Sequence, residues 1–143
     1  MNTRTYDEFK RIFSDEIKKI GFKKNNRSQI NYYLLNPMTT IVLGLQKSYF
    51  GDYLYIEIGL CKTEDISTIP LYYQVIHRLR FLNNKTDMIA YSMISIEEIK
   101  VIVNKLKIIA NNFKRVEDEF IQLINANTDF LIIIRFLRKN SGI

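Results

Sequence analysis

The sequence predicts an α+β fold: a five-stranded antiparallel meander sheet with an N-terminal helix and two or three C-terminal helices packed on one face. Apolar residues recur at helical spacing near both ends of the chain, and they alternate in short segments between residues 29 and 93. The length of 143 residues suits one domain with a substantial core, so we assign residues 1–143 to a single domain.

The stretch from Ile41 to Leu60 predicts a β-hairpin around which the rest of the chain is organised. With Phe50-Gly51 as a two-residue turn, apolar residues pair across one face, as in Leu43 with Ile58. A slip of one residue would mix apolar and polar side chains on both faces, so this register is preferred. Lys47 lies on the apolar face near the tip, and we expect its ammonium group to extend into water.

The segments around this hairpin complete the sheet and begin the helical part. Residues 5–20 predict the first helix, and Gly21 is its expected C-cap. Alternation predicts further strands at residues 29–35, 71–82 and 87–93. Ser95 and Glu98 match a capping box, so a long helix is expected to begin there. It either continues to about residue 125 or breaks near Asn111-Asn112, and a last helix is expected over residues 128–139.

Composition excludes several classes of protein. No apolar run approaches the roughly 20 residues needed to span a membrane, and the charged N-terminal segment does not match a secretory signal. One cysteine, Cys61, excludes an internal disulfide and a cysteine-based metal cluster. The chain uses Ile, Asn and Lys heavily, which is typical of AT-rich genomes. We therefore expect a cytoplasmic bacterial protein without membrane contact and without a cofactor.

The net charge of +6 is concentrated at the two ends of the chain. Residues 1–30 carry eight Lys/Arg against four Asp/Glu, a net of +4, and residues 131–143 carry a net of +3. This distribution allows contact with nucleic acid or another acidic partner, although solvated helix faces explain it as well.

The face of the sheet opposite the apolar one collects tyrosines and arginines. These residue types are common interface anchors because they bury a large area and still make directional hydrogen bonds. A plain solvated face is the alternative interpretation. The predicted binding surface, with Lys47 at its border, consists of Tyr33, Gln46, Lys47, Ser48, Tyr53, Tyr55, Glu57, Arg78 and Arg80.

Other candidate residues favour structural roles. The alternation places His77, the single histidine, on the apolar face, where a core residue is more common than a catalytic base. Cys61 follows an apolar strand and is expected to pack as a small hydrophobe. No nucleophile elbow surrounds Ser48, and no phosphate-binding loop, zinc-ligand spacing or calcium loop is present.

Two motifs carry a family resemblance. The first helix leads into Gly21-Phe22-Lys23-Lys24, and Gln46-Lys47-Ser48-Tyr49-Phe50-Gly51 precedes a strand that ends near Gly59. With arginines in a later strand, this pattern resembles the bacterial family named domain of unknown function 4304, over about residues 5–120. Its members often carry tryptophans where this chain has Tyr49 and Tyr91. The resemblance supports the fold and implies no activity, because none is established for the family.

Three hypotheses of function remain. The first is a binding module that recognises a protein partner through the open sheet face, as a monomer or a homodimer. The second is a nucleic-acid binder that uses the basic ends of the chain for phosphate and tyrosines for stacking. The third is an enzyme with a small pocket around Tyr55, Glu57, Arg78 and Arg80, which requires a deep cleft.

Overall fold

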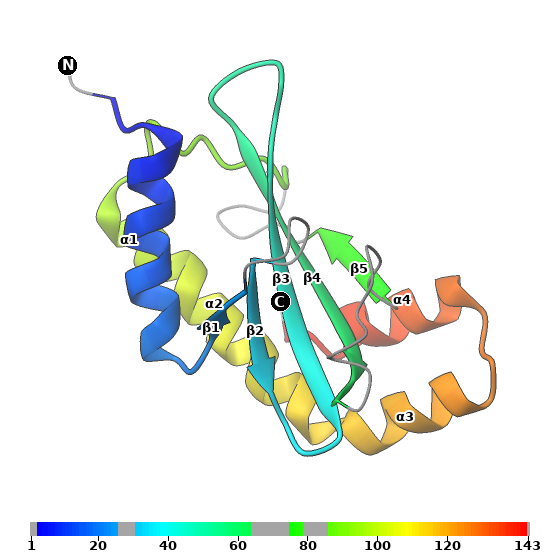
Figure 1. Cartoon of the computed structure of the whole chain (residues 1–143). Coiled ribbons are helices and arrows are strands. Elements are labelled where there is room, and N and C mark those ends of the chain that lie inside the picture. The colour runs from blue at the N-terminus through cyan, green and yellow to red at the C-terminus, as the bar shows by residue number, and fades with distance from the viewer. Residues whose placement is uncertain (1–2, 26–30, 64–74, 79–85, 143) are drawn as a thin grey trace.

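The computed structural model describes residues 3–25, 31–63, 75–78 and 86–142, with the backbone alone for residues 75–78. Helices and strands follow an α+β order along the chain, and the strands form an antiparallel sheet in the order β1-β2-β3-β4-β5 (Figure 1). The elements are α1 (Tyr6–Lys19), β1 (Lys23–Lys24), β2 (Tyr32–Leu35), β3 (Thr39–Lys47), β4 (Leu54–Lys62), β5 (Val75–Arg78), α2 (Ile96–Arg115), α3 (Glu117–Asn125) and α4 (Phe130–Lys139).

The central hairpin has the predicted register. β3 and β4 pair from Thr39 with Lys62 to Lys47 with Leu54, and Leu43 lies opposite Ile58. The two strands place alternate residues on the two faces, so the register follows from the apolar pattern. The ladder ends at Lys47, so the loop at the tip is longer than the predicted two-residue turn.

The predicted meander is correct in four strands and wrong in the fifth. Residues 87–93 form no strand: Ile89 makes a single bridge to Leu54, and the chain turns at residues 91–93. Ile89 and Tyr91 alternate as in a strand, but both are buried in the core without extending a ladder. The sheet is extended instead at the opposite edge, where the two residues of β1 pair with β2. The predicted strand at residues 71–82 appears as β5, and the rest of that range lies outside the described residues.

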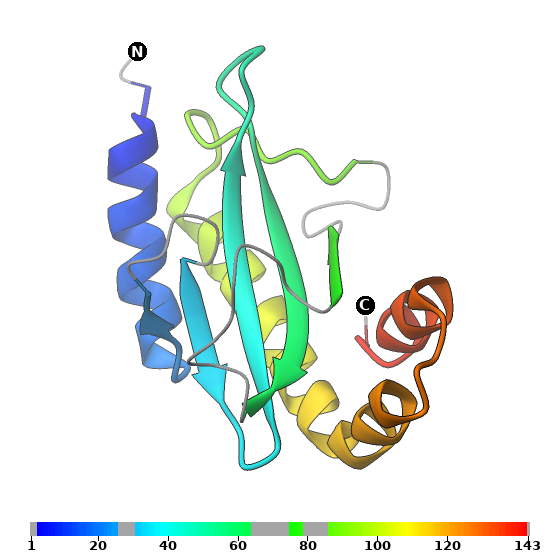
Figure 2. The same ribbon diagram turned by 45° about the vertical axis from the view of Figure 1, so that its right-hand side comes forward.

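The core lies between the sheet and the two helices α1 and α2; in both views α2 runs behind the sheet and α1 stands at its left-hand side (Figures 1 and 2). α1 contributes Phe9, Phe13 and Ile17, and α2 contributes its stripe from Ile99 to Phe113. These side chains meet the apolar face of the hairpin in one buried cluster. α3 and α4 lie beyond the lower part of the sheet on the β5 side, so the prediction that every C-terminal helix shares one face is not confirmed.

Local capping determines where the helices begin and end. Gly21 has φ of +104°, and the amides of Gly21 and Phe22 donate to the carbonyls of Lys18 and Ile17, which is a Schellman C-cap. The predicted C-cap is therefore confirmed. The long helix breaks at Val116, which lies between the two predicted alternatives: Asn111 and Asn112 lie within α2, and α3 continues from Glu117 to Asn125.

The capping box at Ser95 offers a test of this local reading. The Ser95 hydroxyl accepts from the Glu98 amide, and the Glu98 carboxylate accepts from the Ser95 amide. Ser95→Ala is expected to lower the free energy of unfolding by about 1 kcal/mol, because the Glu98 amide loses its acceptor. Urea denaturation measures this change. Ser95→Asp keeps an acceptor and should retain most of the stability; equal losses in both variants would contradict the capping role.

Candidate binding surface at the hairpin end of the sheet

The hairpin brings together most of the residues that the sequence predicted as a binding surface. Gln46 lies opposite Tyr55, and the Ser48 amide donates to the Tyr53 carbonyl at 2.9 Å. Tyr33 of β2 lies on the same face, opposite Val42. The hairpin register and the alternation of side chains therefore place these residues on one side.

The arginines of the predicted surface are only partly described. Arg78 of β5 lies opposite Glu57 of β4 in the backbone ladder. The side chain of Arg78 and all of Arg80 lie outside the described residues.

The polar face is not exposed along its whole length. Thr40 and Val42 lie on this face and are fully buried, and Cys61 is 2% exposed. Tyr33, Tyr55 and Glu57 are half-buried, whereas Gln46 is exposed and Tyr53 is 41% exposed. The accessible part of the predicted surface is therefore its hairpin end. The Cys61 thiol donates to the Thr40 carbonyl in this buried region, in keeping with its predicted structural role.

The tip of the hairpin exposes two aromatic side chains that the sequence analysis did not include in the site. Tyr49 is 98% exposed and Phe50 is 97% exposed, and the loop that carries them projects beyond the sheet (Figures 1 and 2). The Phe50 amide donates to the Ser48 hydroxyl at 3.1 Å, which tightens the turn. Gly51 lets the Tyr53 ring approach, because a Cβ at Gly51 would lie 3.0 Å from it. The signal in the sequence that could have identified these two residues is a pair of adjacent aromatics beside a glycine in a turn.

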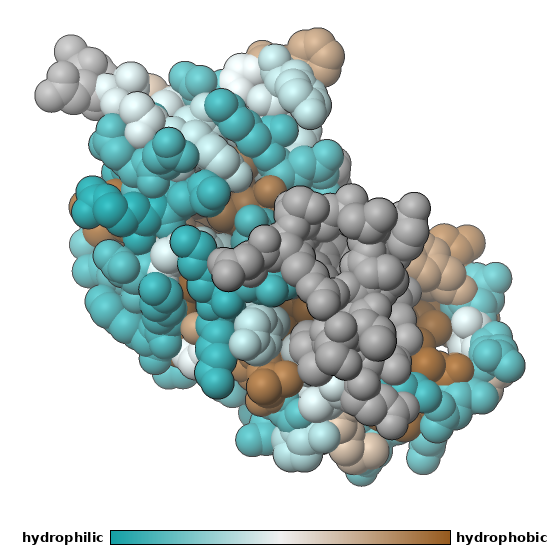
Figure 3. Space-filling model, in the orientation of Figure 1, coloured by the Kyte–Doolittle hydropathy of each residue, from teal (hydrophilic) through white to brown (hydrophobic). Residues whose placement is uncertain are grey.

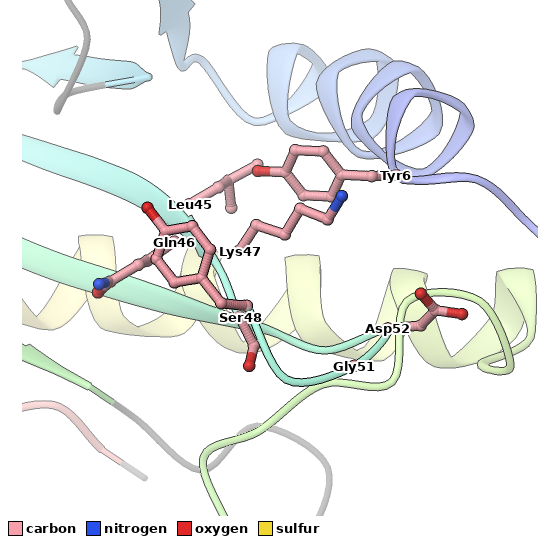
Figure 4. Close-up of a pocket in the computed structure, with 8 residues that line it drawn as sticks. Tyr6, Leu45, Gln46, Lys47, Ser48, Gly51 and Asp52 are labelled. Carbon is pink, nitrogen blue, oxygen red and sulfur yellow. The ribbon is translucent and has the colours of Figure 1, made fainter.

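A groove of about 660 Å³ lies between this hairpin and the start of α1 (Figure 4). Lys47 and Tyr6 point toward each other in it, and the Lys47 ammonium lies 5.4 Å from the centre of the Tyr6 ring. Lys10 approaches the same ring at 5.5 Å. Such cation–π contacts hold the lysine against the aromatic face and leave its charge accessible. The groove is lined by Tyr6, Leu45, Gln46, Lys47, Ser48, Tyr49, Gly51 and Asp52.

A tyrosine network supports the floor of the groove. The Tyr91 hydroxyl donates to Asp52 at 3.1 Å, and the Tyr91 ring meets the Tyr6 ring edge-on at 5.4 Å. Burial raises the pKa of Tyr91, and the hydrogen bond and charge of Asp52 raise it further. Burial also raises the pKa of Tyr6 and of Tyr32, whose hydroxyl bonds to Ser14. The groove is therefore tied to the core through Tyr91.

These raised pKa values predict loss of stability in alkali. Tyrosines of the unfolded chain ionise near the ordinary pKa of 10.0, whereas these three keep their protons longer in the folded state. Their contribution is complete below pH 10.0 and is lost as the pH rises through the raised values. Urea denaturation across this pH range should show that the free energy of unfolding falls less steeply with pH for Tyr91→Phe than for wild type. Tyr49, which is exposed, supplies the control: the stability of Tyr49→Phe should depend on pH as that of wild type does. If Tyr91→Phe showed the same pH dependence as both, the role given to Tyr91 would be contradicted.

The basic ends of the chain do not form one surface. α1 and α4 lie on opposite sides of the molecule in both views, with the sheet between them (Figures 1 and 2). Hydrophilic residues cover the α1 side in Figure 3, where Arg11, Lys18 and Lys19 are exposed. A nucleic-acid duplex could not follow both ends along one continuous stripe.

Within the described parts of the chain, the structure contains no group of three or more His, Cys, Asp or Glu side chains arranged to hold a metal ion. Nor is any described helix both long and apolar enough to cross a lipid bilayer.

Comparison with protein families supports the resemblance seen in the two motifs. Residues 13–93 match the family described as Domain of unknown function (DUF4304). This segment includes the end of α1, the hairpin and Asp52 of the groove, and it covers more than half of the chain. Comparisons with curated proteins and with solved structures found no match. The chain belongs to the DUF4304 family of domains of unknown function.

Proposed function

We propose that the chain is a binding module that recognises a protein partner through the hairpin end of its sheet. The observation that carries this proposal is the almost complete exposure of Tyr49 and Phe50 at the projecting tip. Large aromatic side chains that leave water on binding are frequent hot spots of protein interfaces. Here they stand beside a groove with polar and cationic groups, which supplies directional contacts around an apolar centre.

The predicted sheet-face residues surround this tip in the proposal. Gln46, Ser48 and Tyr53 provide hydrogen-bonding groups next to the aromatics, and Lys47 provides an accessible cation. Tyr33, Tyr55, Glu57, Arg78 and Arg80 form the outer part of the surface. We expect the partner to meet the hairpin first and the sheet face second. The cytoplasm of a bacterium remains the expected location, and the oligomeric state remains a prediction of monomer or homodimer.

The two alternatives have less support. Nucleic-acid binding through both basic ends is opposed by their placement on opposite sides of the molecule. The enzymatic alternative required a pocket around Tyr55 and Glu57, but neither residue lines the groove beside the hairpin. An affinity for RNA that falls steeply with salt would support the nucleic-acid hypothesis.

Site-specific photo-crosslinking tests the proposal in cells of the encoding organism. A photoreactive phenylalanine analogue at Phe50 should give a covalent adduct with one protein, identified by mass spectrometry and then purified for a binding assay. The analogue at Met38, which is 42% exposed in the connection between β2 and β3 at the other end of the hairpin strands, is the matched control. Adducts that form equally at both positions, or none at Phe50, would remove the hairpin as a recognition site.

A further inference from the structure

The outer face of α4 is a second surface that the hairpin site does not explain. Ile133 and Leu137 of this helix are buried, whereas Phe130, Leu131 and Ile132 are 51%, 61% and 51% exposed. The exposed apolar residues follow each other at the start of α4, next to the turn from α3. They gather where the chain reverses direction at the edge of the molecule (Figures 1 and 2). Large adjacent apolar side chains in such a place mark an interaction surface.

Cations continue this surface along the same helix. At 100° per residue, Arg135, Arg138 and Lys139 share the side of Leu131 and Ile132, directly opposite the buried pair. All three cations are exposed, and residues 130–143 contain no Asp or Glu. Phe130 projects from the side of the buried pair, so we name the set Leu131, Ile132, Arg135, Arg138 and Lys139 the α4 surface. Its occupant must accept apolar side chains at one end and positive charge along the rest.

α4 is held in place, so this exposure follows from its packing. Asp129 caps its start by accepting from the Leu131 amide at 2.8 Å, which also places that carboxylate at the positive end of the helix dipole. At the other end, the Asn112 side chain of α2 donates to the Ser141 carbonyl at 3.0 Å. The α4 surface is therefore presented by a helix that is anchored at both ends.

Contrary to the expectation from the sequence of a protein without membrane contact, we propose that the α4 surface binds anionic phospholipid at the surface of a membrane. Leu131 and Ile132 enter the boundary between headgroups and acyl chains, and the three cations contact lipid phosphates. This combination of exposed apolar residues and cations on one helix is that of interfacial helices, which lie on a bilayer and do not span it. Cations near an anionic leaflet add attraction that falls with distance and with salt.

Three other occupants fit the α4 surface less well. Nucleic acid would use the cations and leave the apolar residues in water. A second copy in a two-fold dimer would bring like charges together. An acidic protein surface would match the charge, but the α4 surface offers no neutral hydrogen-bonding side chain, and specific protein interfaces depend on many directional hydrogen bonds. Binding to an anionic bilayer requires only apolar side chains that insert and cations that contact phosphates, and the α4 surface provides both.

Vesicle sedimentation with the whole chain tests the proposal. Wild type should pellet with phosphatidylglycerol/phosphatidylcholine vesicles, should remain in solution with phosphatidylcholine alone, and should be released by added salt. Arg135→Glu/Arg138→Glu and Leu131→Ser/Ile132→Ser should each weaken binding about tenfold or more. Arg11→Glu/Lys18→Glu changes the net charge equally but lies on α1, so it should bind as wild type does. Circular dichroism verifies that each variant is folded.

A fluorescent reporter distinguishes insertion from simple charge attraction. The chain contains no tryptophan, so Leu131→Trp introduces a single indole whose emission should shift to shorter wavelength on anionic vesicles. Phe50→Trp at the hairpin tip should show no shift, which separates this surface from the proposed protein-binding site. The proposal is overturned if wild type does not pellet, if the α1 variant loses binding equally, if Leu131→Ser/Ile132→Ser binds normally, or if an acidic protein binds α4 and vesicles do not.

Discussion

Tyr49→Ser/Phe50→Ser is expected to weaken binding of the crosslinked partner about a hundredfold or more, because truncating one aromatic hot spot costs roughly 2 kcal/mol or above. The free energy of unfolding should change by less than about 0.5 kcal/mol, since both side chains are almost fully exposed in the free chain. Titration calorimetry with the purified partner and urea denaturation of the variant measure the two quantities.

The control for this variant is a pair of exposed apolar residues elsewhere. Met93→Ser/Ile96→Ser removes side chains that are 65% and 48% exposed near the start of α2. It should bind the partner as wild type does. An equal loss of affinity in both double variants would show that general surface hydrophobicity, and not the hairpin tip, determines binding. Normal binding by Tyr49→Ser/Phe50→Ser would refute the proposed function and leave the α4 proposal untouched.

Phe13→Ala is expected to lower the free energy of unfolding by about 3–5 kcal/mol, the usual cost of removing a fully buried aromatic side chain. Phe13 is 0% exposed, and its ring lies 5.7 Å from that of Phe9 and 5.6 Å from that of Tyr32. The substitution leaves a cavity between α1 and β2. Because small domains have total free energies of unfolding of about 5–15 kcal/mol, the loss of this ring would remove a large part of the stability of the fold.

Urea denaturation of Phe13→Ala gives the size of the effect, with Ile12→Ala as the comparison on the same helix. Ile12 is only half-buried beside the core, so its truncation should cost distinctly less. If Phe13→Ala cost less than Ile12→Ala, the side of α1 that faces the sheet would have been assigned wrongly. A Phe13→Leu variant fills most of the volume and should recover much of the lost stability.

The features that were predictable depend on residues close together in sequence. Thr5, Gly21 and Ser95 were readable as helix ends because caps are hydrogen bonds to the nearest few amides. The β3–β4 register followed from alternation on both sides of one turn. The strand predicted at residues 87–93 was wrong because alternation is also a local signal. It indicates that Ile89 and Tyr91 are buried, but it cannot indicate whether the edge of a neighbouring strand is available for pairing.

The arrangement of the candidate surface was predictable only in part. Gln46, Ser48, Tyr53 and Tyr55 share a face as expected, because side-chain period along a strand is local. Lys47 was placed correctly on the other face, but its partner Tyr6 is about forty residues away in sequence, so no local pattern could reveal their contact. The sequence marked Tyr49 and Phe50 as aromatics beside a glycine turn, but their exposure depends on which segments pack around that turn.

By itself, the sequence determined the α+β class, the ends of α1, the start of α2 and the pairing of the central hairpin, because propensity, capping and alternation act between near neighbours. Only the tertiary structure decided that half of the polar sheet face is buried, that Tyr6 joins the hairpin groove, that α1 and α4 lie on opposite sides, and that α4 directs apolar residues and cations outward. These features depend on how segments distant in sequence exclude water from one another, and burial of that kind is a property of the packed chain.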